Sequence, residues 1–154
     1  MSRQNKRELV QALGEAFRRA QNVNQVFDRA AAERLGVNLT DLFAMDLLHQ
    51  RERLTAGELA REMGLTTGAV TAVVDRLERA GYAERVRDDQ DRRRVLIALT
   101  PKALAAVNEI YEPLKHAWVR YMDRRTAAEL ELILEFMRGA QGVVLEHLDR
   151  VRET

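Results

Sequence analysis

The chain has 154 residues, of which 46% are hydrophobic and 32% are charged, so it is long enough to bury a core without disulfides or structural metals. It contains no cysteine, which excludes disulfides, thiolate metal sites and sensing by thiol oxidation. The net charge is +1 and no segment is long and apolar enough to span a bilayer, so we expect a cytoplasmic protein with no membrane partner.

The N-terminal third predicts two helices. In the first, apolar residues recur at steps of three and four, and the helix should end at Leu35, before Gly36. These periodic residues are Leu9, Leu13, Phe17, Ala20, Val23, Phe27 and Ala31. A second helix should follow Asn38, and we expect it to be largely buried because its apolar residues point in most directions. They are Leu42, Phe43, Met45, Leu47 and Leu48.

Two short helices joined by a turn at residues 63–66 predict a helix-turn-helix. Thr55 and Glu58 have the spacing of a capping box for the third helix, whose inward residues are Leu59, Ala60 and Met63. Thr66 should cap the fourth helix, which should end at Gly81. Its inward face is Val70, Val73, Val74 and Leu77, and its outward face begins with Thr66, Thr67, Gly68 and Thr71.

Residues 82–86 and 95–99 predict two antiparallel strands around a polar tip at residues 88–94. From Arg85 to Arg94 there are five arginines and three aspartates. One interpretation is a solvated hairpin whose charges neutralise one another. The other is a wing, in which Arg92 and Arg93 enter a narrow minor groove and Asp91 orients the guanidinium of Arg93. Aspartate also favours turns, which gives Asp91 a second interpretation.

The C-terminal third predicts two more helices. Pro101 should open the fifth, and Pro113 should kink it. Its apolar positions are Leu104, Val107, Tyr111, Leu114, Trp118 and Tyr121. Thr126 and Glu129 form a second capping box before a last helix with heptad spacing. That spacing joins Leu130, Leu134, Met137, Gln141, Val144, Leu148 and Val151.

Together these elements predict a single domain, residues 1–154, that is mainly α with a small β wing: a winged helix-turn-helix flanked by long dimerisation helices. Residues 37–100 form the DNA-binding lobe. Residues 1–36 and 101–154 form the dimerisation helices, because their apolar stripes exceed what the lobe can cover. A twofold homodimer would place two recognition helices about 34 Å apart on DNA. The alternative is a monomeric helical domain folded back on itself.

The outward face of the fourth helix suits DNA. The free amides at its start favour a phosphate, Thr71 can touch base edges, and Arg76 can reach farther along the groove. The candidate DNA-binding residues are Thr55, Thr66, Thr67, Gly68, Thr71, Arg76, Asp91, Arg92 and Arg93. In the alternative interpretation they are ordinary exposed residues.

Several of these motifs have a family resemblance. They are Leu54-Thr55-x3-Leu59-Ala60, Gly64-Leu65-Thr66, Val70-Thr71, Leu77-Glu78-x2-Gly81-Tyr82 and Asp91-x-Arg93-x5-Leu99-Thr100-Pro101. With them the chain resembles the MarR family of bacterial transcription regulators. The resemblance implies a homodimeric repressor on a palindromic operator, with Arg93 in the minor groove, released by a small, often aromatic anionic molecule between the lobes. Many relatives have arginine where this chain has Ala72, so we expect base readout to depend on Thr67, Thr71, Arg76 and DNA shape.

A pocket for an aromatic effector could be lined by five residues that otherwise have the spacing of ordinary core packing: Phe17, Met45, His49, Tyr111 and Trp118. The histidines His49, His116 and His147 lie far apart, so we expect no metal and no cofactor.

The sequence has no phosphate-binding glycine loop and no nucleophile–base pair, which argues against an enzyme. The alternative function is a winged-helix module that binds another protein and not DNA. Such a module would have no use for Arg92 and Arg93 in a groove-reaching position.

Overall fold

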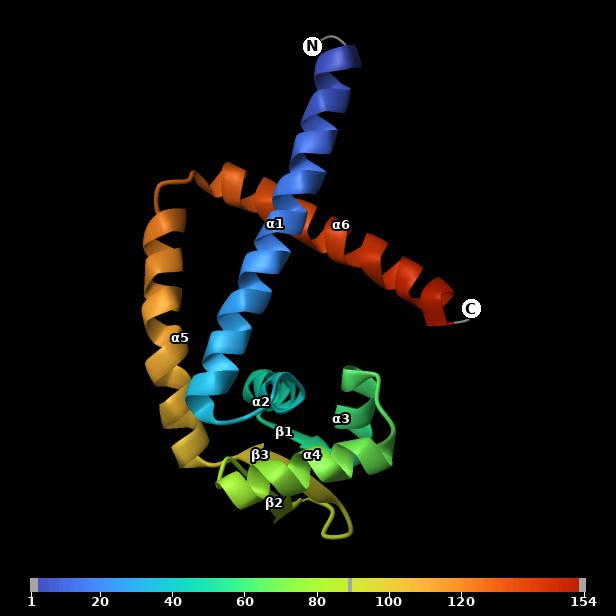
Figure 1. Ribbon diagram of the computed structural model, residues 1–154, viewed down its shortest axis with the longest axis vertical. Helices are drawn as coiled ribbons and strands as arrows, with labels where there is room; N and C mark the ends of the chain where they lie inside the picture. The colour runs from blue at the N-terminus through green and yellow to red at the C-terminus, as the bar shows by residue number, and fades with distance from the viewer. Residues whose placement is uncertain (1–2, 89, 153–154) are drawn as a thin grey trace. The chain divides into compact units, whose positions relative to one another are not determined.

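The computed structural model describes residues 3–88 and 90–152. Its middle segment packs helices on a small sheet, and longer helices precede and follow this segment (Figure 1). The elements are α1 (Arg3–Leu35), α2 (Leu39–Arg51), β1 (Arg53–Thr55), α3 (Ala56–Met63), α4 (Thr67–Ala80), β2 (Ala83–Arg87), β3 (Val95–Leu99), α5 (Pro101–Met122) and α6 (Ala127–Arg152). The six predicted helices and the two predicted strands are thus confirmed.

The sheet has one more strand than the sequence predicts. Its order is β1-β3-β2, and both pairs are antiparallel, with Leu54 of β1 and Arg85 of β2 on either side of Ile97. Three residues are too few to show the alternation that marks a strand in a sequence. β1 forms because the outer edge of β3 offers unpaired backbone groups to the segment just before α3.

The core lies between the sheet and α2, α3 and α4. Its largest fully buried side chains are Met45, Leu48, Leu59, Val70, Val74, Leu77 and Ile97. The predicted inward face of α4 is therefore confirmed, whereas Met63 of α3 is only half-buried.

The prediction that Phe43 is buried was wrong, because its side chain is 44% exposed. Burial along α2 repeats every three residues, in the pairs 41–42, 44–45 and 47–48. Phe43 lies in the third, outward row with Asp46 and His49, so an apolar residue type alone did not place it in the core.

Local capping sets both ends of α4. The Thr66 hydroxyl accepts a hydrogen bond from the Ala69 amide at 3.3 Å, which opens the helix. Gly81 ends it in the left-handed conformation at φ 74°, and its N–H bonds to carbonyls of the last turn. Glycine adopts this conformation without steric cost, so the helix stops there and the chain turns into β2.

The chain divides into two compact units, residues 1–110 and 111–154. The division falls inside α5, which continues as a helix through Pro113, and not at the predicted lobe boundary after Thr100. The predicted kink and the single-domain assignment stay predictions. Within the described ranges, no helix is both long and apolar enough to cross a bilayer.

Candidate nucleic-acid interface

The first turn of α4 presents small polar groups. Thr66, Thr67, Gly68 and Thr71 are all exposed, and the N–H groups at the start of the helix precede its first intrahelical bond. The Thr71 hydroxyl donates to the Thr67 carbonyl oxygen at 3.0 Å. Its lone pairs and its methyl group remain available on the outer surface. An anion or a base edge can therefore approach the backbone closely at this end of α4.

Arg76, in the second half of α4, forms a bidentate contact with Asp41 of α2. Its Nε lies 3.0 Å from Asp41 Oδ2, and its Nη2 lies 2.6 Å from Oδ1. Asp41 is only 3% exposed, and the Asn38 amide donates to its Oδ2 at 3.0 Å. The hydrogen bond to Asp41 raises the pKa of Arg76. The structure therefore gives Arg76 a role in joining α4 to α2, and its predicted contact with DNA stays a prediction.

Thr55 is half-buried and caps α3. Its backbone N–H and its hydroxyl each donate to Glu58 Oε2 at 2.7 Å, and the Glu58 N–H donates to its hydroxyl oxygen at 3.2 Å. The predicted capping box is thus confirmed. Hydrogen bonds from Thr55 to the carboxylate are the main reason that the pKa of Glu58 is lowered. The predicted contact of Thr55 with DNA stays a prediction.

Two acids on α4, Asp75 and Glu78, are neutralised by Arg85 of β2. Arg85 Nη2 lies 2.8 Å from Asp75 Oδ1, and Nη1 pairs with Glu78 Oε2. Carboxylates beside a phosphate backbone would otherwise repel it. Sequence reasoning missed this role of Arg85, since no local pattern indicates which helix faces a strand residue.

The wing tip is shaped by aspartates that bond to backbone groups. Asp88 Oδ1 accepts from the Gln90 N–H at 2.9 Å, and Asp91 Oδ1 accepts from the Arg93 N–H at 3.0 Å. The structure corrects the idea that Asp91 holds the guanidinium of Arg93: the contact is to the backbone, and turn chemistry accounts for it.

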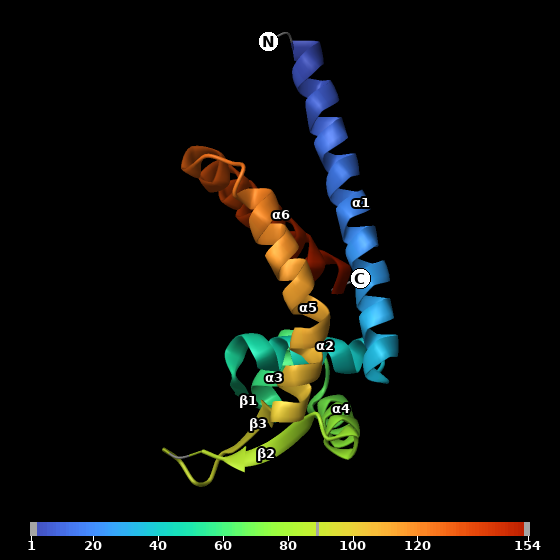
Figure 2. The ribbon, with the colours of Figure 1, turned by 90° about the vertical axis from the view of Figure 1, so that its left-hand side faces the viewer.

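The wing arginines differ in their partners. Arg94 lies 3.5 Å from Glu58 Oε1 and 3.7 Å from Asp88 Oδ2. Arg92 and Arg93 are exposed, and their guanidinium groups form no hydrogen bond or ion pair with any residue in the described ranges. Both arginines belong to the segment that connects β2 to β3, and the β2–β3 hairpin extends beyond α3 and α4 (Figure 2). Their positive charge is therefore open to an external anion.

The five candidate effector residues differ in burial. Met45 is 1% exposed and belongs to the core, as the packing interpretation predicts. Phe17 and Tyr111 are half-buried, whereas His49 and Trp118 are exposed. Phe17, Met45 and His49 belong to the unit of residues 1–110. Tyr111 and Trp118 belong to the unit of residues 111–154. A shared effector pocket stays a prediction.

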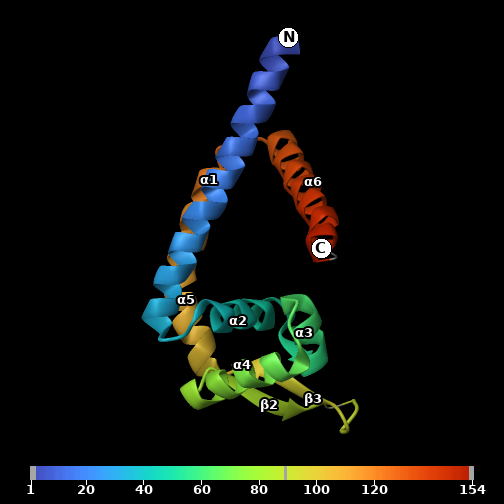
Figure 3. The same cartoon turned by 45° about the vertical axis from the view of Figure 1, so that its right-hand side comes forward.

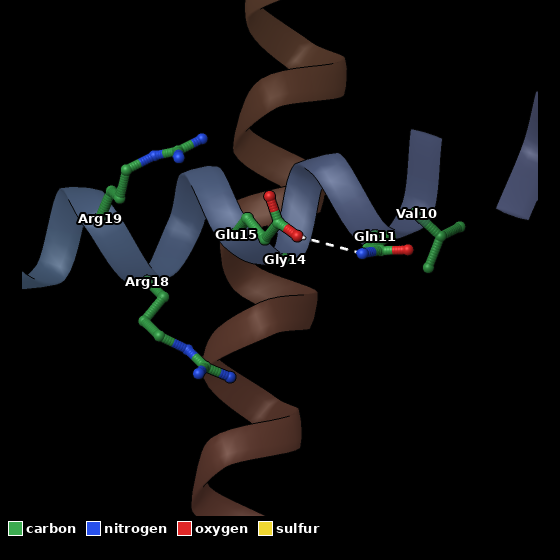
Figure 4. A pocket seen from close by; sticks show the side chains of 6 residues that line it. All are labelled: Val10, Gln11, Gly14, Glu15, Arg18 and Arg19. Atoms are coloured by element: carbon green, nitrogen blue, oxygen red, sulfur yellow. Dashed lines mark hydrogen bonds between the residues drawn. The ribbon is translucent and has the colours of Figure 1, made fainter. Parts of the chain in front are cut away.

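Figure 4 shows a pocket on α1 that uses none of these residues. Its lining is Val10, Gln11, Gly14, Glu15, Arg18 and Arg19. All six are exposed residues of one helix, and Gln11 donates to Glu15 at 3.1 Å. Among the described residues there is also no group of three or more histidines and carboxylates that could hold a metal ion.

A helix-turn-helix followed by a hairpin with exposed arginines defines a winged-helix DNA-binding protein. The MarR family model matches residues 37–95. The uncharacterised HTH-type transcriptional regulator YcgE of Bacillus subtilis is 39% identical over 99% of this chain and 100% of its own length. The chain belongs to the MarR family. It is a DNA-binding transcription regulator and not an enzyme.

Two further comparisons agree with this assignment. The solved structure of a MarR family protein from Bacillus stearothermophilus has 25% identity and a TM-score of 0.65, covering 94% of this chain and 99% of that one. The organic hydroperoxide resistance transcriptional regulator of Bacillus subtilis is 32% identical over 44% of this chain and 46% of its own length.

Proposed function

We propose that the protein is a homodimeric repressor that binds a palindromic operator and is released by a small molecule. The observation that carries the DNA-binding mode is the exposure of Arg92 and Arg93 on a hairpin that follows α4, with guanidinium groups that have no partner among the described residues. α4 lies beside the sheet from which that hairpin extends (Figure 3). A helix in the major groove and a tip in the adjacent minor groove would use both features together.

The remaining DNA contacts follow from exposure along α4. In this proposal the N-terminal amides and the hydroxyls of Thr66 and Thr67 hold a phosphate, and Gly68 lets the backbone come close. Thr71 reads a base edge through its lone pairs or its methyl group. Thr55 and Arg76 act mainly by holding α3 and α4 in place, and their direct contacts to DNA are secondary in this proposal.

The homodimer is supported by the apolar surface of the long helices. α6 exposes many large apolar residues: Leu130, Leu132, Ile133, Leu134, Phe136, Met137, Val143, Val144, Leu145, Leu148 and Val151. α1 adds Leu9, Val10, Leu13, Val23 and Val26. Exposed apolar surface of this extent is normally covered by a partner, so a second copy of the chain is the partner that we propose.

Release by a small molecule is the part of the proposal that rests on the family resemblance. The relative named for organic hydroperoxide resistance points to oxidants as one effector class. This chain has no cysteine, so an oxidant could not act through a thiol. From the family resemblance we propose a reversibly bound aromatic anion as the effector.

A salt titration of DNA binding tests the proposed mode. The probes are the DNA upstream of the protein's own coding region and a random-sequence duplex. Neutralising several phosphates makes affinity fall steeply as salt rises. We expect Arg93→Ala to weaken binding by roughly tenfold, a loss of about 1.4 kcal/mol, with the dimer intact.

The matched control is Arg124→Ala, which removes an exposed arginine from the turn between α5 and α6. It should bind like the parent protein. A flat salt response of the parent protein would favour a protein-binding module. Unchanged operator affinity of Arg93→Ala would remove the wing from the mechanism.

A further inference from the structure

Arg87 is the last residue of β2, between the arginine that contacts α4 and the arginines of the tip. It is exposed, and its cross-strand neighbour is Val95, which carries no charge. Side chains alternate along a strand, so Arg87 shares a sheet face with Arg85, about 6.8 Å farther toward the tip. Arg87 thus lies on β2 between the residue that contacts α4 and the wing tip.

The described acids around Arg87 are paired with other groups or lie on the other face of the strand. Arg85 pairs with both Asp75 and Glu78. Asp88 accepts from the Gln90 N–H and lies 3.7 Å from Arg94. Glu84 belongs to the opposite face of the strand. The guanidinium of Arg87 forms no hydrogen bond or ion pair with any residue of 3–88 or 90–152.

DNA geometry supplies a ligand for this position. The major and minor grooves are separated by a sugar–phosphate strand, so a protein that occupies both must pass over that strand. The residues between its helix and its tip then face phosphate oxygens. A guanidinium donates paired N–H groups to a phosphate and is more weakly hydrated than an ammonium group.

We propose that Arg87 is an additional DNA-binding residue, which contacts the phosphate strand between the major groove occupied by α4 and the minor groove occupied by the wing tip. This inference rests on the proposed DNA-binding mode. Arg85 lies on the same face of β2, but its guanidinium pairs with Asp75 and Glu78. The guanidinium of Arg87 has no such partner among the described residues and can bind a phosphate. A phosphate contact adds affinity without sequence preference.

The test compares Arg87→Gln with the parent protein, using the upstream duplex and the random-sequence duplex over a range of salt concentrations. We expect Arg87→Gln to bind both duplexes roughly tenfold more weakly. The slope of log affinity against log salt is negative, and its magnitude should decrease by about 0.9 per protomer. Arg87→Lys keeps the positive charge and should retain most of the slope. Arg124→Gln, with the same change in net charge, should behave like the parent protein.

Three results would overturn the inference. If Arg87→Gln keeps the affinity and slope of the parent protein while Arg93→Ala loses affinity, Arg87 does not bind phosphate and the proposed DNA-binding mode stands. A loss confined to the upstream duplex would show that Arg87 reads bases and not the backbone. If the parent protein shows no salt-dependent binding to either duplex, the proposed DNA-binding mode and the inference fail together.

Discussion

At the scale of single residues, the contact between Asp41 and Arg76 joins two helices of the DNA-binding lobe. Asp41 is 3% exposed, and its carboxylate receives both the guanidinium of Arg76 and the side-chain amide of Asn38. The Arg76 side chain remains 39% exposed, so solvent screens part of the attraction. Removing the Asp41 carboxylate would still leave the N–H donors of Arg76 and Asn38 without an acceptor at a buried position.

Asp41→Asn should therefore destabilise the protein by about 1–3 kcal/mol, because a neutral amide cannot replace the charged bidentate acceptor. Urea unfolding at neutral pH measures the change. The control is Asp46→Asn on the exposed side of α2, where the Asp46 carboxylate accepts from Gln50 at 2.8 Å and from no other side chain in the part of the chain that the structure describes. Asp46→Asn should lower the free energy of unfolding far less than Asp41→Asn does. Equal losses for the two variants would contradict a special role for the Asp41–Arg76 pair.

At the scale of elements, the start of α3 depends on an ionised carboxylate. Hydrogen bonds from Thr55 lower the pKa of Glu58, and Arg94 lowers it further. A carboxylate whose pKa is lower in the folded state adds stability above its unfolded-state pKa, and that stability is lost as the pH falls through the folded value. The contribution should be of the size of a helix cap, about 1 kcal/mol.

Glu58→Gln should thus be less stable than the parent protein at neutral pH, and the difference in free energy of unfolding should shrink as the pH falls below about 4. Urea unfolding across this pH range checks it. The same difference at every pH would show that the charge of Glu58 does not stabilise α3. Glu62→Gln, at an exposed position of the same helix, is the control.

A second element-scale contact joins the ends of α1 and α4 to the start of α5. The Tyr82 hydroxyl donates to the Leu35 carbonyl at 3.0 Å, and Lys102 Nζ donates to the Ala80 carbonyl at 2.6 Å. Lys102 also lies 4.8 Å from the centroid of the Tyr82 ring. Helix C-termini carry unsatisfied carbonyls and partial negative charge, which both donors offset.

Tyr82→Phe should cost about 1 kcal/mol, because it removes only the hydroxyl and leaves a helix-terminal carbonyl without this donor. Thermal or urea unfolding reports the loss. Tyr121→Phe is the matched control, since the Tyr121 hydroxyl is exposed and only accepts from Arg125 at 3.3 Å. If Tyr82→Phe were as stable as the parent protein, water would have replaced the hydroxyl at no cost.

At the scale of the whole molecule, the apolar surface of α6 predicts assembly. Leu134 is 48% exposed and Met137 is 51% exposed in the single chain. Leu134→Glu should shift the protein from dimer to monomer at micromolar concentration, because it would place an unpaired charge in the proposed interface. Sedimentation velocity measures this shift. Arg138→Glu, at an exposed polar position of α6, should leave the dimer in place. A monomeric parent protein would refute the assembly.

The sequence by itself determined the six helices, the strands β2 and β3, and the family. Thr55 with Glu58, Thr66 and Gly81 act on backbone groups within four residues, so the bounds of α3 and α4 follow from local chemistry. The inward face of α4 follows from helical periodicity. The polar hairpin tip could likewise be recognised before any packing was known.

Only the tertiary structure decided how the charges are shared. Asp41 meets Arg76 across 35 positions of sequence, and Arg94 meets Glu58 across 36. β1 became a strand only because β3 lies beside it. Such contacts depend on how the elements pack together, which no pattern within a few residues encodes. That packing engages Arg85 and Arg94 within the protein and leaves the guanidinium groups of Arg87, Arg92 and Arg93 exposed.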